Sequence, residues 1–236
     1  MREKTMGGMP ARDIGIRESK AARQPVYTKG EELFNAVSHI VGAGLGVLFC
    51  IASFLVASRD PSVNKYVAAG IYSFTVIALY TMSALYHFLP QGTAKRIFRI
   101  FDHCSIFLLI AGCYTPFCLV AFWSLPVGKI IFAVEWGLAL LGITFNAINM
   151  EWKAVKVISH ISYVVMGWMI VFILPIFLDS VSLACFLWLL AGGVFYTVGI
   201  VFYALGRKKS YMHCIWHVFV LLGSVFQFVS IILLLL

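Results

Sequence analysis

The sequence predicts an all-α membrane protein, a bundle of seven transmembrane helices. Of its 236 residues, 61% are apolar and 12% are charged, and the mean hydropathy is +0.94, whereas a soluble domain carries about 25% charged residues. Seven apolar stretches lie between the charged residues, and a spanning helix needs about 20 residues. They are too long and too continuously apolar for barrel strands. The composition therefore excludes a soluble enzyme.

Seven spans follow in chain order from the gaps between charged residues: 36–58, 66–89, 103–123, 128–150, 157–178, 182–206 and 212–235. Thr28, followed three residues later by Glu31, has the signature of a capping box, so the first helix is expected to begin near Lys29 and continue into its span. Pro116 and Pro175 fall inside the third and fifth spans, where proline kinks a helix. The connections are too short to hold a soluble domain.

The basic residues predict the orientation. Residues 1–30 are mixed in charge and poor in large apolar residues, which is typical of a disordered tail, and residues 31–236 form the transmembrane domain. Fifteen of the 18 lysines and arginines lie on the side of the N-terminus, and without the tail the count is eight against three. Because cytoplasmic segments carry the basic excess, we expect a multi-pass protein of the inner (plasma) membrane, with the N-terminus cytoplasmic and the C-terminus external.

All six histidines fall at helix ends that this orientation places on the cytoplasmic side: His39, His87, His103, His160, His213 and His217. His213 and His217 are four residues apart, so their imidazoles project from one face of the last helix, as two ligands of a tetrahedral zinc site require. Ser83 and His87 repeat this spacing on the second helix and place a hydroxyl one turn deeper than a third imidazole. Three histidines and a carboxylate-held water would make a catalytic zinc site with one open position.

Further polar residues are expected to support this site. Asp102 is the candidate carboxylate, and with His103 it is predicted to open the third helix, whose N-terminus favours negative charge. Glu31, Asn35 and His39 run at helical spacing into the first helix and are candidates for orienting the ligands through hydrogen bonds. His103 adjoins Asp102, and neighbours on a helix diverge by about 100°. It is therefore given a supporting role and not a metal-binding one.

Other polar or small residues are given structural roles. Glu135 is predicted to anchor the fourth helix at the outer membrane interface. The six cysteines form no CxxC pair, so no disulfide is expected. The spacing of Gly42 and Gly46, and the adjacent pair Gly192 and Gly193, predict surfaces for close helix packing within the bundle.

Four motifs resemble the hemolysin III family of bacterial membrane proteins, which belongs with the progestin and adipoQ receptor family: EELFNAVSH at 31–39, SALYH at 83–87, FDHCSIFLLIAGCYTPF at 101–117 and HCIWH at 213–217. The resemblance implies a seven-helix fold with a cytoplasmic N-terminus. It also implies zinc bound by His87, His213 and His217, a water positioned by Asp102, and Ser83 near the site. The wider group is thought to comprise lipid amide hydrolases.

Two functions remain open at this point. The first is a zinc-dependent hydrolase of a lipid amide or ester at the cytoplasmic leaflet, in which Asp102 takes a proton from water and Ser83 hydrogen-bonds the substrate carbonyl or the developing oxyanion. The second is a non-enzymatic sensor of membrane state, or a haemolytic protein that permeabilises membranes, with a structural zinc. The expected partners are the lipid bilayer and a lipid substrate. Nucleic acid is not expected, and the sequence indicates no protein partner.

Overall fold

A computed structural model describes residues 27–206 and 208–236. The elements are α1 (Lys29–Ala57), α2 (Val63–Phe88), α3 (Thr93–Pro116), the π-helical η1 (Phe117–Ala121), α4 (Pro126–Asn149), α5 (Lys153–Gly167), the 3-10 helix η2 (Met169–Ile173), α6 (Leu174–Ser180), α7 (Leu183–Leu205) and α8 (Met212–Leu235). In the described chain, seven helical segments are long and apolar enough to cross a membrane. Two of them are composite: α3 and η1 form one segment, and α5, η2 and α6 together form another. The predicted seven-helix architecture is confirmed.

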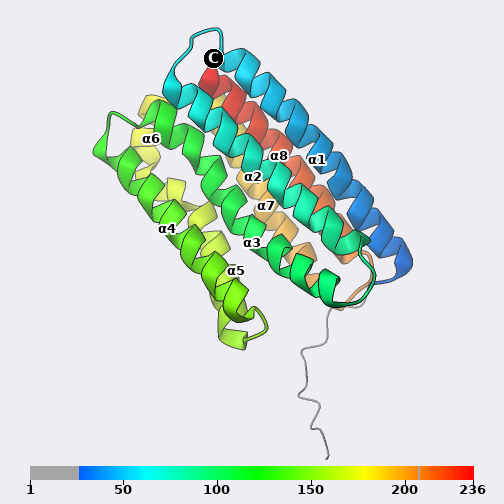
Figure 1. The fold of residues 1–236 in the computed structure, drawn as a ribbon. Coiled ribbons are helices and arrows are strands. Elements are labelled where there is room, and N and C mark those ends of the chain that lie inside the picture. The colour runs from blue at the N-terminus through cyan, green and yellow to red at the C-terminus, as the bar shows by residue number, and fades with distance from the viewer. Residues whose placement is uncertain (1–26, 207) are drawn as a thin grey trace, which may run out of the picture.

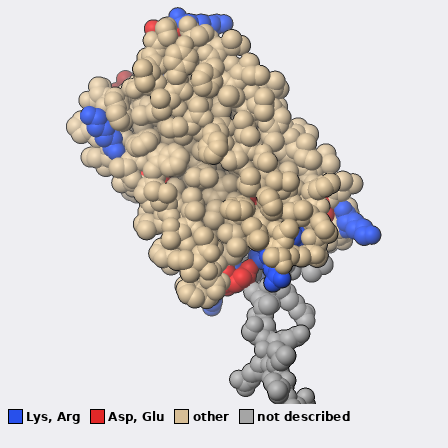
Figure 2. Space-filling model, in the orientation of Figure 1, with Lys and Arg blue, Asp and Glu red and all other residues tan. Residues whose placement is uncertain are grey.

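The helices pack side by side in the order α7, α8, α1, α2, α3, α4 and α5. Figure 1 shows α4 and α5 beyond α3, on the side away from α1. On the face shown in Figure 2, charged side chains gather toward the ends of the bundle and leave a wide, largely uncharged band between them. Such a band is what a bilayer requires, since charges inside hydrocarbon are costly. Because the chain alternates direction, the start of α1, the end of α2 and the starts of α3, α5 and α8 lie at one end of the bundle.

Local sequence signals account for several boundaries. Thr28 and Glu31 form the predicted capping box, in which the Thr28 side chain accepts from the Glu31 N–H and the Glu31 side chain accepts from the Thr28 N–H. Pro116 ends the regular part of α3, and η1 follows it directly. Pro175 lies in the first turn of α6, after the fifth span has broken at Gly167. Of the predicted tail, residues 1–26 lie outside the described residues, and 27–30 belong to the fold.

The predicted start of the third helix at residue 103 is wrong. The helix α3 begins at Thr93. Lys95 and Arg99, which sequence reasoning placed in a loop, are therefore helical, and both are buried, at 1% and 9% exposed. Each is paired with a carboxylate, Lys95 with Glu32 and Arg99 with Glu151. Asp102 is consequently about two and a half turns into α3. The field of a helix terminus fades within the first turn, so the terminal stabilisation expected for Asp102 does not apply.

The prediction that Glu135 anchors α4 at the interface is also wrong. Glu135 is the tenth residue of α4 and is fully buried, and neither carboxylate oxygen has a hydrogen-bond partner among the described residues. The prediction placed Glu135 near the outer end of the fourth helix. In the structure α4 begins nine residues before it, so Glu135 lies well inside the helix. All six cysteines are free thiols, as expected.

Two glycines of the predicted surfaces, Gly42 and Gly192, lie at close helix contacts inside the bundle. Gly42 packs directly against the ring of Tyr80, so α1 and α2 approach closely there. Gly192 faces α8, where an added Cβ would lie 3.0 Å from the Gly223 carbonyl oxygen. Gly193 differs, since an added Cβ would meet no atom within 4 Å.

Candidate metal centre

The structure brings the three predicted metal ligands together at one end of the bundle. One ring nitrogen from each of His87, His213 and His217 lies within 4.8 Å of the other two, and all three side chains are buried. The Nε2 atoms of His213 and His217 are 3.2 Å apart, close to the separation of about 3.3 Å for two nitrogens bound at about 2.0–2.1 Å to one tetrahedral ion. His87 Nε2 is buried and has no hydrogen-bond partner among the described residues. This donor set fits a divalent metal such as zinc.

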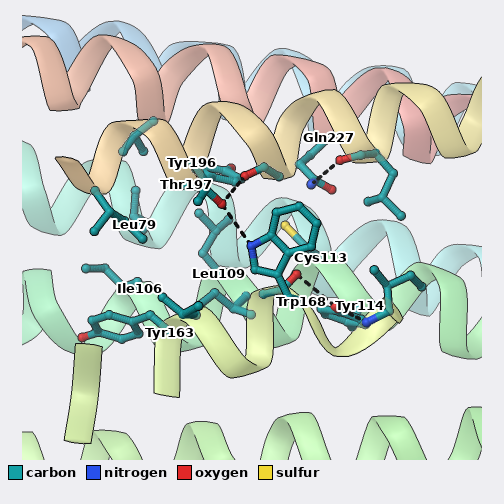
Figure 3. Close-up of a pocket in the computed structure, with 18 of the residues that line it drawn as sticks. Leu79, Ile106, Leu109, Cys113, Tyr114, Tyr163, Trp168, Tyr196, Thr197 and Gln227 are labelled. Atoms are coloured by element: carbon teal, nitrogen blue, oxygen red, sulfur yellow. Dashed lines mark hydrogen bonds between the residues drawn. The ribbon is translucent and has the colours of Figure 1, made fainter. Parts of the chain in front are cut away.

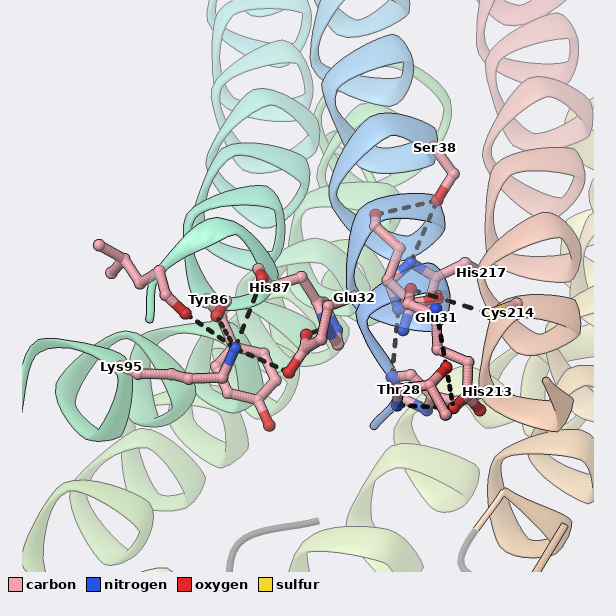
Figure 4. Close-up of polar contacts among 12 residues, drawn as sticks. Thr28, Glu31, Glu32, Ser38, Tyr86, His87, Lys95, His213, Cys214 and His217 are labelled. Carbon is pink, nitrogen blue, oxygen red and sulfur yellow. Dashed lines mark hydrogen bonds and ion pairs between the residues drawn. The ribbon is translucent and has the colours of Figure 1, made fainter. Parts of the chain in front are cut away.

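The first turns of α8 carry two of these histidines, and α1 fixes where α8 begins. Tyr211 precedes α8 in a left-handed conformation (φ 62°), and its N–H donates to Glu31 Oε1 at 2.6 Å. Glu31 was expected to orient a ligand directly. Its carboxylate instead accepts hydrogen bonds from Thr28 and Tyr211. Glu31 therefore acts on His213 and His217 through the start of their helix (Figure 4).

Two other residues of α1 contact His217 itself. Ser38 Oγ lies 3.3 Å from His217 Nδ1 and donates to the Asn35 carbonyl. His39 stacks on His217, with ring centroids 3.7 Å apart. The Asn35 amide is buried without a hydrogen-bond partner among the described residues. Of the residues predicted to support the ligands, His39 therefore contacts one through its ring and Asn35 lies near one through its backbone.

Asp102 and Ser83 lie on the wall of a cavity of about 60 Å³ next to the histidines, together with His213 and His217. The Asp102 carboxylate interacts with the Ser83 side chain and electrostatically with His87. Asp102 is outside the set of groups whose ligand atoms are all within 4.8 Å of one another. A cavity of this size has room for several waters, at about 10–15 Å³ each by this kind of measure.

His103 is on the cavity wall but outside the group of three candidate ligands. It lines both the small cavity and a larger apolar one, and its backbone carbonyl accepts from the Tyr163 hydroxyl at 2.9 Å. No hydrogen bond joins its side chain to a metal-ligand candidate among the described residues. Its supporting role therefore stays a prediction.

Sequence reasoning missed three residues at the site. Glu32 Oε2 lies 2.7 Å from His87 Nδ1, and Lys95 Nζ lies 2.9 Å from Glu32 Oε1. Tyr27 stacks on His213, with ring centroids 4.9 Å apart, and burial raises the pKa of its phenol, as do the neighbouring Tyr86 and others. Glu32 could have been noticed as the second of two adjacent glutamates. Nothing in the spacing marks Lys95 or Tyr27.

A larger cavity of about 180 Å³ adjoins the site, lined almost wholly by apolar and aromatic side chains of α3, α5, η2, α7 and α8. It shares wall residues with the small cavity, among them His103 and Tyr203. Figure 3 shows Trp168, the residue between α5 and η2, at this cavity, where its indole N–H donates to Thr197 on α7 at 3.0 Å. The backbones of α5 and α7 scarcely touch, and this hydrogen bond bridges the seam between them.

Comparison with known proteins agrees with this architecture. The sequence profile of the family described as "Haemolysin-III related" matches residues 27–228. Hemolysin-3 of Bacillus cereus is 36% identical over 209 residues, which cover 89% of this chain and 93% of the relative. Hemolysin-3 homolog of Bacillus subtilis (strain 168) is 34% identical over 203 residues, covering 86% and 93%. Monocyte to macrophage differentiation factor of Homo sapiens is 22% identical over 210 residues, covering 85% and 83%. The profile match and the two bacterial relatives confirm the resemblance found in the four motifs, and the chain belongs to the haemolysin III family.

Proposed function

We propose that this protein is a zinc-dependent hydrolase of a lipid amide or ester, acting in the cytoplasmic leaflet of the inner membrane. The observation that carries the proposal is the convergence of three buried imidazoles, with His87 Nε2 left without a partner. Three histidines with space beside them are the ligand arrangement of catalytic zinc sites, whereas structural sites are closed by a fourth protein ligand. The small cavity supplies that space, since it is lined by His213, His217 and Asp102.

His87, His213 and His217 would hold the zinc ion. When bound, zinc lowers the pKa of water toward neutrality and polarises a carbonyl. Asp102 would accept the proton of the attacking water, because its carboxylate lines the same cavity and is outside the ligand set. The single O–H of Ser83 donates to the ionised Asp102 carboxylate. Once Asp102 has taken the proton, this O–H would be free to donate to the substrate carbonyl oxygen as negative charge develops on it.

The apolar cavity supports a lipid as the substrate. A substrate whose carbonyl reaches Asp102 could extend its acyl chain into the cavity of about 180 Å³, since the two cavities share wall residues. The seam between α5 and α7 gives that chain a route from the bilayer. The placement in the cytoplasmic leaflet is supported by the basic residues, 15 of which lie on the side of the N-terminus.

The test combines zinc quantification with lipid hydrolysis on purified wild type, His213→Ala and Asp102→Asn. Wild type is expected to carry zinc and hydrolyse a lipid amide or ester, and His213→Ala to lose both. Asp102→Asn is expected to keep zinc and lose about 10²–10⁴-fold in rate, as for removal of a general base. Glu151→Gln is the matched control, an acidic residue at the same end of the bundle. Zinc-free wild type, or full activity in Asp102→Asn, would refute the proposal.

A second candidate function rests on the names of the relatives, since two bacterial proteins at 36% and 34% identity are named Hemolysin-3 and Hemolysin-3 homolog. In this version the metal is structural and the protein permeabilises membranes or senses their state. Wild type and Asp102→Asn would then release contents equally well from erythrocytes or dye-loaded vesicles, and neither would hydrolyse lipid.

A further inference from the structure

We infer that Glu32, held in place by Lys95, is the residue that positions His87 as a metal ligand. The inference rests on the proposed metal centre and adds to it a hydrogen-bonded chain, Lys95 to Glu32 to His87, which joins α3, α1 and α2 (Figure 4). His213 and His217 have their positions fixed by one helix. His87 comes from another helix, and its ring needs a separate restraint.

The chain starts from two adjacent glutamates on α1. Successive residues of a helix point about 100° apart, so Glu31 and Glu32 cannot serve the same neighbour. Glu31 reaches the start of α8 through Tyr211. Glu32 reaches the other side of the site, where its Oε2 lies 2.7 Å from His87 Nδ1.

This contact selects the nitrogen of His87 that is free for a metal. An ionised carboxylate only accepts hydrogen bonds, so Nδ1 of a neutral His87 ring carries the hydrogen and Nε2 is left unprotonated. It is Nε2 that is buried without a partner among the described residues. A carboxylate on the second nitrogen also fixes the ring's orientation and raises its basicity as a ligand, and loss of such partners typically costs 10–100-fold in metal affinity.

Lys95 holds the carboxylate and the end of α2 together. Its Nζ lies 2.9 Å from Glu32 Oε1 and donates to the backbone carbonyls of Tyr86 (2.9 Å) and Leu89 (3.1 Å). The last carbonyls of a helix have no partner within it, and a cation there is favoured by the helix dipole. Lys95 is 1% exposed, and these oxygens take the place of water around its ammonium group. The turn of α2 that carries His87 is therefore held by the same residue that holds Glu32.

The test measures metal affinity, with zinc and cobalt(II) as probes, in purified full-length wild type, Glu32→Ala, Glu32→Gln and the double variant Glu32→Ala/Lys95→Met. Glu151→Gln is the matched control, since Glu151 pairs with two basic residues at the same end of the bundle. Glu32→Ala is expected to bind zinc about 10–100-fold more weakly and to show an altered visible spectrum with cobalt(II). Glu32→Gln keeps a hydrogen-bond acceptor but not the charge, so its zinc affinity is expected to lie between those of wild type and Glu32→Ala. Glu151→Gln is expected to match wild type in metal affinity and in the cobalt(II) spectrum.

The double variant separates positioning from repulsion. Glu32→Ala alone leaves the Lys95 ammonium unpaired near the site, where it could repel a cation. If the double variant regains wild-type affinity, repulsion explains the loss and the positioning role is refuted. Continued weak binding supports it.

Metal-free stability is measured for each variant. A Glu32→Ala protein that is less stable without metal but binds zinc and cobalt(II) as wild type does would show Glu32 to be structural only. If wild type itself binds neither metal, the proposed centre fails together with this inference, whereas wild-type binding with unchanged Glu32 variants refutes the inference alone.

Discussion

Gly192 and Gly193 are neighbours on α7 for which the structure predicts opposite responses to alanine. Either substitution restricts the unfolded chain, which raises the free energy of unfolding by about 0.4–1 kcal/mol where the backbone is compatible. At Gly193 the new Cβ meets no atom within 4 Å, whereas at Gly192 it lies 3.0 Å from the Gly223 carbonyl oxygen and from two atoms of Gln227. Overpacking of this kind costs about 1–3 kcal/mol. Because the backbone gain is common to both, Gly193→Ala should exceed Gly192→Ala in stability by about 1–3 kcal/mol.

The assay is equilibrium unfolding of both variants and wild type in the same lipid and detergent micelles. Gly193→Ala is expected to be at least as stable as wild type, and Gly192→Ala less stable. Equal stabilities, or a more stable Gly192→Ala, would show that α7 and α8 are not packed as closely as the structure has them.

The same position tests the role of the apolar cavity, because Gly193 lines it. Gly193→Leu places four carbons where an acyl chain is proposed to lie, so hydrolysis of long-chain substrates should fall by at least about tenfold, equivalent to about 1.4 kcal/mol of transition-state binding. Zinc content should not change. Gly44→Leu is the control, an exposed helical glycine whose Cβ would likewise meet nothing within 4 Å. Unchanged long-chain hydrolysis in Gly193→Leu would remove the cavity from the proposed substrate path.

Two further predictions concern acidic residues outside the proposed centre. Burial raises the pKa of Glu151, but the Lys156 hydrogen bond and the charge of Arg99 lower it by more, so its contribution is present at neutral pH and is lost as the pH falls through this depressed value. Glu151→Gln should therefore cost about 1 kcal/mol at neutral pH and nothing in strong acid, as measured by unfolding across pH. At Glu135, whose buried carboxylate has no hydrogen-bond partner among the described residues, Gln should be tolerated in an unfolding assay, whereas Lys should cost about 3 kcal/mol. A strongly destabilised Glu135→Gln would indicate an ion pair at that site.

The sequence predicted the features that depend on local spacing. Apolar length determines the number of spans, and the four-residue interval in HCIWH places two imidazoles on one face of α8 without reference to any other helix. The capping box at Thr28 is equally local and is confirmed. The association of His87 with the α8 histidines could be proposed from sequence because all three lie at the same end of an alternating bundle.

Features that depend on which helices are neighbours could not be predicted in this way. The contact between Glu32 and His87 requires α1 to pack beside α2 with a particular rotation. The buried side of Glu135 likewise depends on how α4 faces α3. Tyr27 lies before the first helix, in a segment whose composition is typical of disorder, and only the assembled site gives it a partner in His213.

The misplaced start of α3 shows where a charge-based reading of spans fails. Such a reading assumes that a lysine marks water, because an ammonium group in hydrocarbon is costly. That cost is offset at Lys95 by a carboxylate and by carbonyls that the end of α2 leaves without partners. A buried ion pair of this kind adds little net stability compared with apolar packing, but removing one partner is strongly destabilising. The ion pair is therefore better explained by the geometry it imposes on neighbouring groups, and the group in contact with Glu32 is the His87 imidazole.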